Sequence, residues 1–120
     1  MAYYRDFREF LRALDERGKL VRIRETINKD TELFPLVRLQ FRGLPEEERM
    51  GFLFEQVVGA DGRRYEMPVA TGVIAGSTPI YAIGLNCTVE EIGVRWDAAL
   101  RAPLPPVSTG GNTPRTVITG

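Results

Sequence analysis

Few side chains in this sequence are of the kinds that perform catalysis. The chain has no histidine and one cysteine, Cys87, so it cannot by itself form a Ser-His-Asp triad, a Cys-His dyad or a histidine-based metal site. Cys87 comes directly before a predicted helix start, where a thiol can be activated as a nucleophile. A single cysteine without a neighbouring base is more often a small buried residue, and we interpret Cys87 as packing.

A metal site in this chain would have to be built from carboxylates. The sequence contains no Asp-x-Asp-x-Asp loop with a following glycine and a distal glutamate, the pattern of a calcium-binding loop. The segment from Gly72 to Thr78 superficially resembles a phosphate-binding loop, but it lacks the lysine and its glycines are too closely spaced. A turn from strand to helix explains this segment. A weak anion site at the amides of Ser77 and Thr78 stays open as an alternative.

Two pairs of arginines could recognise an anion. Arg22 and Arg24 alternate along a predicted strand, and Arg63 and Arg64 are adjacent after a predicted turn. Guanidinium groups bind carboxylates and phosphates through paired donors, although arginines in such positions are more often solvated strand edges. We therefore predict that this chain holds no catalytic residue, no cofactor-binding residue and no metal ligand.

Composition limits the class of protein. The chain has 120 residues, of which 43% are hydrophobic, enough for one modest core and one domain. Its 16 basic and 16 acidic residues cancel, whereas nucleic-acid binders normally carry a basic excess. No apolar run approaches a membrane span, and the first residues lack the pattern of a secretory signal. These features, with the single cysteine, predict a cytoplasmic protein.

The first predicted element is an amphipathic helix. Its apolar residues fall on one stripe and are Phe7, Phe10, Leu11 and Leu14. Asp6 can cap its first turn, and Gly18 supplies the left-handed residue that ends it. Val21 and Ile23 then alternate with arginines, as in a half-buried strand.

A second helix and a hairpin are predicted in the middle of the chain. Helical spacing returns at Leu33, Leu36, Val37 and Phe41, and Pro35 must lie in the first turn of that helix. The charged run from Glu46 to Arg49 is interpreted as a solvated loop. Residues 52–58 predict a strand, and the Asp61-Gly62 pair predicts the turn that follows it.

One strand and two helices are predicted next. Residues 68–75 predict a strand buried on both faces, and residues 80–85 a short helix. Residues 88–101 predict a longer helix, started by a capping box between Thr88 and Glu91. The residues expected to face inward on that helix are Val89, Ile92, Trp96, Ala99 and Leu100.

The composition changes after Ala102. Prolines and glycines predict that residues 103–114 are extended and irregular, while residues 115–119 have the composition of a strand. We therefore predict one α+β domain over residues 1–102, with amphipathic helices packed on a small β-sheet. Residues 103–120 are predicted to be a Pro/Gly-rich connector and the first strand leading toward another domain.

Five segments, in this order, resemble the N-terminal domain of the UbiD family of decarboxylases, and no single one of them is specific. They are residues 7–23, Phe52 to Gly59, Met67 to Val69, Thr88 to Glu91, and Pro103 to Val107. Residues 115–120 also resemble the stretch that, in the family, enters the flavin-binding domain.

The resemblance implies a carboxy-lyase that reversibly decarboxylates an aromatic or conjugated carboxylic acid, including bulky or CoA-activated ones. The implied cofactor is prenylated FMN with a divalent metal such as Mn²⁺, and K⁺, and the implied assembly is a homo-oligomer. In the family, the cofactor ligands and catalytic residues belong to the region that would follow Gly120. The resemblance therefore implies that this 120-residue segment alone is inactive and binds no cofactor.

Two other readings stay open from the sequence. The chain could be a free-standing accessory subunit that docks on a catalytic partner through the strand at residues 115–119. It could also be a non-catalytic module that binds a small ligand or an anion near Ser77 and the arginines.

Overall fold

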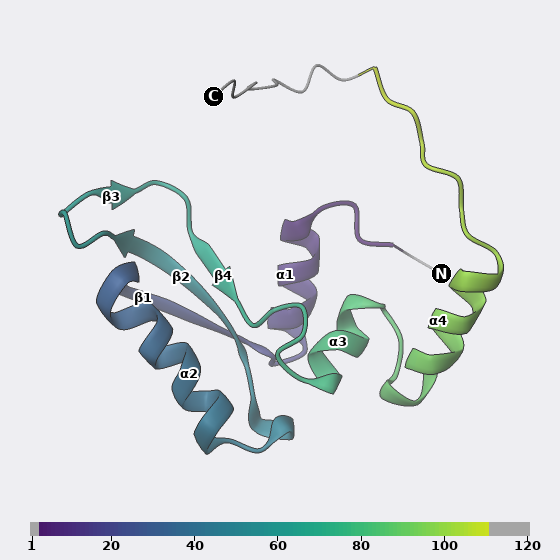
Figure 1. The fold of residues 1–120 in the computed structure, drawn as a ribbon, viewed down its shortest axis with the longest axis horizontal. Coiled ribbons are helices and arrows are strands. Elements are labelled where there is room, and N and C mark those ends of the chain that lie inside the picture. Colours follow the sequence, from purple (N-terminus) through teal and green to yellow (C-terminus); the bar gives the residue numbers. More distant parts are fainter. Residues whose placement is uncertain (1–2, 111–120) are drawn as a thin grey trace, which may run out of the picture.

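The computed structural model describes residues 3–110, and these residues confirm the predicted α+β fold. They form four α-helices and a mixed four-stranded sheet; α1 and α2 pack on the sheet, α3 joins the core that α1 makes with it, and α4 lies beyond α3 (Figure 1). In chain order the elements are α1 Phe7–Glu16, β1 Leu20–Asn28, a π-helical turn Lys29–Leu33, α2 Phe34–Gly43, a 3₁₀ turn Glu46–Glu48, β2 Gly51–Val58, β3 Arg64–Tyr65, β4 Val69–Thr71, α3 Thr78–Gly84, a 3₁₀ turn Val89–Glu91, and α4 Ile92–Arg101. No helix among them is both long and apolar enough to cross a membrane.

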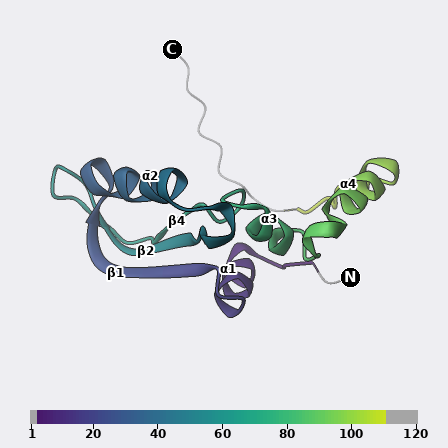
Figure 2. The ribbon, with the colours of Figure 1, turned by 90° about the horizontal axis from the view of Figure 1, so that it is seen from below.

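Strand β2 is the centre of the sheet. It pairs in parallel with β1, with Leu20 opposite Gly51, and antiparallel with β3 and β4. A parallel pair needs a crossover connection, which here runs through the π-helical turn and α2. Figure 2 shows α2 on one face of the sheet and α1 on the opposite side, at the end where β1 begins.

Two small cores lie on either side of β2. Leu33, Phe54 and Val57 are buried beneath α2, with Leu36 and Val37 of the helix packed against them. The other core joins α1 and α3 to the sheet and contains Phe10, Leu14, Leu20, Leu53, Val73, Ile80 and Ile83. Because neighbouring side chains of a strand point to opposite faces, Leu53 and Phe54 serve different cores.

The start and end of α1 are as predicted. The Asp6 carboxylate accepts a hydrogen bond from the Glu9 amide at 2.8 Å, and Gly18, with φ +68°, follows the helix. Phe10 and Leu14 are buried, while Phe7 at the outer edge of the stripe is half exposed. β1 extends to Asn28, well beyond the predicted strand.

At the C-terminal end of α2, the sequence predicted the wrong inward-facing residue: Phe41 was expected inside, one position after the residue that is. Gln40 is buried and Phe41 is exposed. The Gln40 side chain donates from Nε2 to the Met50 carbonyl at 2.7 Å and accepts from the Met50 amide at 2.9 Å. These two bonds satisfy the amide in the interior, where an unpaired polar group would be costly.

The strand predicted over residues 68–75 is much shorter, and it is not buried on both faces. β4 ends at Thr71 because Gly72 adopts φ +67° and turns the chain. A Cβ at Gly76 would lie 2.3 Å from the Gly72 carbonyl oxygen, so the turn closes tightly there. Val73 is buried beyond the turn, whereas Ile74 is exposed.

The predicted helix at residues 88–101 forms, but its start and its packing differ from expectation. The Glu91 amide donates to the Thr88 carbonyl at 3.1 Å in a 3₁₀ turn, so it is not available to the Thr88 hydroxyl. That hydroxyl instead donates to the Glu91 carboxylate. No residue of α4 is buried within residues 3–110. The strand predicted at residues 115–119 lies outside the described residues.

Candidate functional site

Among residues 3–110, no group of three or more His, Cys, Asp or Glu side chains is placed to hold a metal ion. Cys87 lies half buried in the connection between α3 and α4. Its amide donates to the Ala82 carbonyl at 3.0 Å, which fixes the backbone of the connection. That the chain carries no catalytic, cofactor or metal-binding residue stays a prediction.

The amides at the start of α3 hold a carboxylate of the chain itself. Ser77 caps the helix by accepting from the Ile80 amide, and the Glu46 carboxylate accepts from both the amide and the hydroxyl of Thr78. The Thr78 hydroxyl, followed by its amide, holds the pKa of Glu46 below its usual value. A negative charge is favourable at this end of a helix, so Glu46 occupies the position suggested for an external anion.

This contact corrects the interpretation of residues 46–49 as a solvated loop for Glu46, whereas Glu47 and Glu48 are exposed as predicted. Glu46 connects the turn before β2 to α3, 32 positions further along the chain. The sequence carried one signal for it, because Ser77 and Thr78 precede a short apolar helix and leave unpaired amides. Nothing in the sequence identified which acidic side chain would bind these amides.

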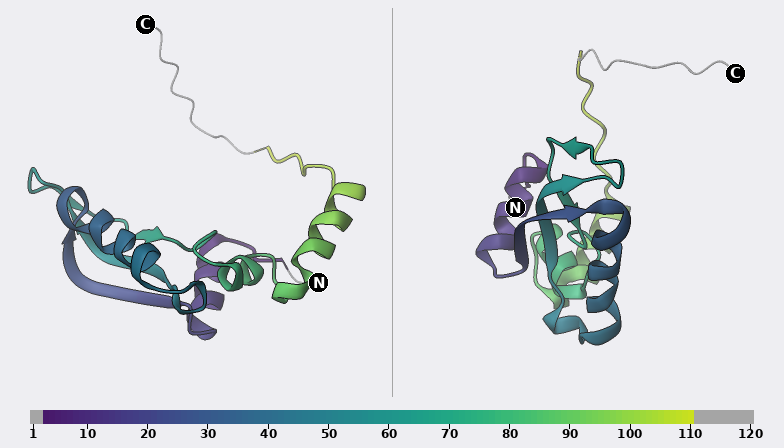
Figure 3. Two further views of the ribbon diagram at one scale, coloured as in Figure 1. Left: turned by 60° about the horizontal axis from the view of Figure 1, so that its bottom comes forward. Right: turned by 90° about the vertical axis from the view of Figure 1, so that its left-hand side faces the viewer.

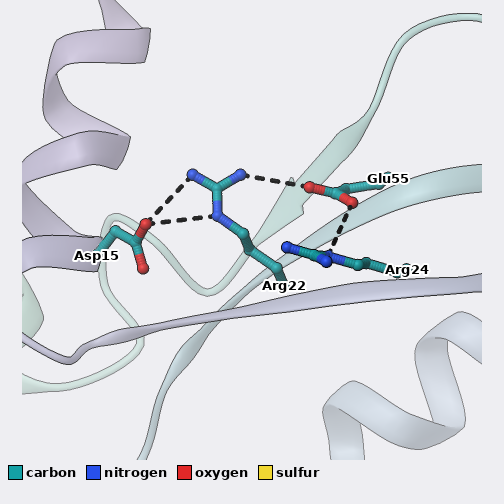
Figure 4. A network of polar contacts seen from close by, with 4 residues as sticks. All are labelled: Asp15, Arg22, Arg24 and Glu55. Carbon is teal, nitrogen blue, oxygen red and sulfur yellow. Dashed lines mark hydrogen bonds and ion pairs between the residues drawn. The ribbon is translucent and has the colours of Figure 1, made fainter.

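Arg22 and Arg24 are paired with carboxylates of the same chain (Figure 4). The Arg22 guanidinium lies 3.3 Å from Asp15 at the end of α1 and 3.3 Å from Glu55 on β2. Arg24 lies 3.8 Å from the other oxygen of Glu55. These groups are partly or largely exposed, so each pair contributes little stability. They connect side chains of α1, β1 and β2 at the surface.

The second arginine pair lies at the β2–β3 hairpin, where the Asp61-Gly62 turn forms as predicted. The Arg63 guanidinium lies over the Tyr65 ring, 5.1 Å from its centre, and Arg64 donates to Gln56 at 3.4 Å. Asp30 also reaches this hairpin, because its carboxylate accepts from the Ala60 amide at 2.8 Å. The hydrogen bond from Lys29 and then that from Ala60 lower the pKa of Asp30.

Several exposed apolar side chains lie on α4 and on the segment after it. We call this the α4–connector face, and its residues are Val94, Trp96, Leu100, Leu104 and Val107. Leu100 is 74% exposed and Val107 is 87% exposed. Figure 3 shows α4 at one end of the molecule, away from the sheet. Trp96 Nε1 donates a hydrogen bond of 2.7 Å to the Tyr81 hydroxyl, and this bond connects α4 to α3.

The inward stripe predicted for this helix is therefore wrong for residues 3–110. Val89, Trp96 and Leu100 are exposed, and Ile92 is half buried. Exposed apolar side chains gathered in one segment of the chain are candidates for an interface. The α4–connector face is thus the strongest candidate for a functional surface in the described part of the chain.

The chain was compared with known families and structures. No family model matches it. One solved structure is similar over 82% of this chain, with 30% sequence identity and a TM-score of 0.59. It is an evolved dimeric form of the UbiD-class enzyme HmfF from Pelotomaculum thermopropionicum, in complex with prFMN. The fold is UbiD-like.

The same comparison sets the scale of the similarity. The match covers 20% of the HmfF chain, so this sequence spans about a fifth of that enzyme. The resemblance inferred from the five sequence segments is supported at the level of fold. A match to a fifth of the enzyme does not show the activity, the cofactor or the assembly of a whole enzyme for this chain.

Proposed function

We propose that residues 1–102 are the N-terminal scaffold domain of a UbiD-like carboxy-lyase, and that residues 103–120 lead toward its flavin-binding domain. The observation that carries the proposal is the similarity to HmfF over 82% of this chain at 30% identity. The proposed reaction is the reversible decarboxylation of an aromatic or conjugated carboxylic acid, including bulky or CoA-activated acids.

The proposed cofactor is prenylated FMN, the group bound in the HmfF structure, with a divalent metal such as Mn²⁺, and K⁺. When bound, this flavin supplies an electron sink for the loss of carbon dioxide. The described residues do not fit it: they offer no cluster of metal ligands, and the amides of α3 already hold Glu46. We assign the cofactor to the remaining four fifths of such an enzyme, and derive no catalytic step for residues 3–110.

The role proposed for this domain is structural. The α4–connector face presents exposed apolar side chains directly before residues 111–120, on the path toward the next domain. Burying it would stabilise the enzyme by about 25 cal/mol for each Å² of apolar surface removed from water. The same face would suit a separate catalytic partner, so the free-standing accessory subunit is the second candidate. A homo-oligomer of the complete enzyme is part of the leading proposal.

The reading frame beyond codon 120 distinguishes the two candidates. A frame that continues into a flavin-binding domain supports the scaffold role, and the encoded protein should then purify with bound prenylated FMN. A stop codon after Gly120 favours the accessory subunit. A continuing frame whose product binds no prenylated FMN would contradict the leading proposal.

A further inference from the structure

An aromatic hollow of about 410 Å³ lies between the start of α1, the turn after β4 and helix α3. Its lining includes the rings of Tyr4, Phe7, Phe10 and Tyr81. The ring centre of Phe10 lies 5.4 Å from that of Tyr4 and 6.1 Å from that of Phe7, so these three rings form one continuous cluster. At the rim Phe7 is 50% exposed and Ile74 is 65% exposed. The hollow therefore presents apolar and aromatic side chains to solvent.

The same chain carries a segment with the chemistry that such a surface binds. Residues 103–107 have the sequence Pro-Leu-Pro-Pro-Val, and we call them the proline segment. All residues from 101 to 110 are exposed, with Leu104 at 76% and Val107 at 87%. Proline-rich segments favour the extended polyproline II conformation and bind aromatic-lined grooves, because a chain that is already stiff loses little entropy on binding.

Trp96 connects the hollow to the helix from which the proline segment leaves. Its Nε1 donates to the hydroxyl of Tyr81, and Tyr81 lines the hollow. Trp96 and Leu100 are both exposed and lie four residues apart, so they share one side of α4. Apolar surface thus continues from the hollow, across Trp96, to the last turn of α4.

The proline segment is long enough to return to the hollow while α4 stays in place. Trp96 lies five residues before the end of the helix at Arg101, which is a distance of about 7.5 Å along the helix axis. Residues 102–107 span about 19 Å in the polyproline II conformation. After the chain reverses direction, the segment can therefore pass Trp96 and reach Tyr81.

We propose that the proline segment folds back over Trp96 and binds in the aromatic hollow of the same chain, as a strap that holds α4 against α1 and α3. The prolines then lie against the rings of Phe7 and Tyr81, and the Leu104 and Val107 side chains leave water. Figure 3 shows the segment extending away from α4, so the bound strap is a second arrangement of the connector.

The lining of the hollow suits this apolar occupant. Its charged residue is Asp6, whose carboxylate already accepts from the Glu9 amide at 2.8 Å. The Tyr4 hydroxyl likewise donates to the Ile83 carbonyl at 2.6 Å. These polar groups are engaged within the domain, so binding depends on the apolar contact. The inference does not rest on the proposed function, because it needs neither flavin nor activity.

Methyl NMR of the 120-residue chain, labelled at leucine and valine, tests the proposal. The methyl resonances of Leu104 and Val107 should shift upfield because they lie over aromatic rings, and they should show NOEs to Phe7 and Tyr81. Free-chain positions for these methyl groups, without such NOEs, would overturn the proposal. Shifts that weaken on dilution would place the segment in the hollow of a second copy and would likewise overturn it.

A matched pair of variants locates the binding surface. Ile74→Asn places a polar side chain at the rim of the hollow and should return the Val107 methyl groups to their free-chain positions. Leu39→Asn is the control, because Leu39 is 66% exposed on α2 and lies outside the hollow. It should leave the Val107 shifts unchanged. Equal effects of the two variants would contradict the assignment of the hollow.

Variants of the proline segment give a second readout, the acrylamide quenching of Trp96, which is the single tryptophan of the chain. Replacing Pro105 and Pro106 together with glycine makes the segment flexible, so more entropy is lost on binding, and quenching should increase as the indole is uncovered. Ser108→Gly is the control and should change nothing. These positions lie outside every helix and strand, so the domain folds in each variant. Equal quenching of the glycine variant and the native chain would overturn the strap.

Discussion

Glu46 is an ionisable residue that links two parts of the described fold. Its carboxylate joins the turn before β2 to the start of α3 by accepting two hydrogen bonds from Thr78. These bonds lower its pKa from the ordinary value of 4.5. A group whose pKa is lowered on folding stabilises the folded state at pH values above its ordinary pKa, and this contribution is lost as the pH falls through the lowered value.

Glu46→Gln should therefore lower the midpoint of urea unfolding at neutral pH. The difference from the native chain should shrink as the pH is lowered below 4.5, because the native carboxylate then becomes protonated. Glu48→Gln is the matched control from the same turn and should change little. Equal effects of the two variants, or a difference that does not depend on pH, would contradict the role assigned to Glu46.

Gln40 is a polar residue that is buried and holds the backbone of Met50 through two hydrogen bonds. Gln40→Ala should destabilise the fold by about 1–3 kcal/mol, because it leaves the amide and carbonyl of Met50 without partners. Arg38→Ala, an exposed position on the same helix, should change stability by less than about 0.5 kcal/mol in dilute solution. Urea unfolding of the two variants measures both values, and similar values for both would show that the Gln40 hydrogen bonds contribute nothing.

At the scale of elements, α4 should be the least stable helix of the isolated chain. It buries no residue within residues 3–110, and regions with few buried contacts open locally at low free energy. Hydrogen exchange should therefore be faster in α4 than in β2. Tyr81→Phe removes the hydrogen bond to Trp96 and should accelerate exchange in α4 while leaving β2 unchanged. Protection of α4 equal to that of β2 would contradict this account.

Elements with a strong local signal were predictable from the sequence. Neighbouring residues determine the apolar stripe of α1 and its Asp6 cap. They also determine the position of the proline in the first turn of α2 and the turn at Asp61-Gly62. The length of β4 and the burial of Gln40 are not, because both depend on contacts made by residues far apart in the chain. The exposed stripe of α4 had the periodicity of a packed helix, and periodicity does not indicate where the packing partner is.

At the scale of the whole molecule, two small cores share one central strand, and several apolar side chains of α2 and α4 remain outside them. The sequence could predict the class of fold and the candidate arginines. It could not predict that Asp15 and Glu55 would neutralise Arg22 and Arg24, since those pairs form only when α1, β1 and β2 meet. The α4–connector face likewise became visible as a candidate interface only once α4 was placed.

Carbon dioxide release from aromatic and conjugated carboxylic acids, measured with added prenylated FMN and Mn²⁺, tests the central claim most directly. We predict no release by the 120-residue chain, release by the protein encoded by the continuing frame, and loss of that release when residues 1–102 are deleted. Release by the 120-residue chain alone would contradict the claim that this domain is a scaffold whose reacting groups belong to another part of the enzyme.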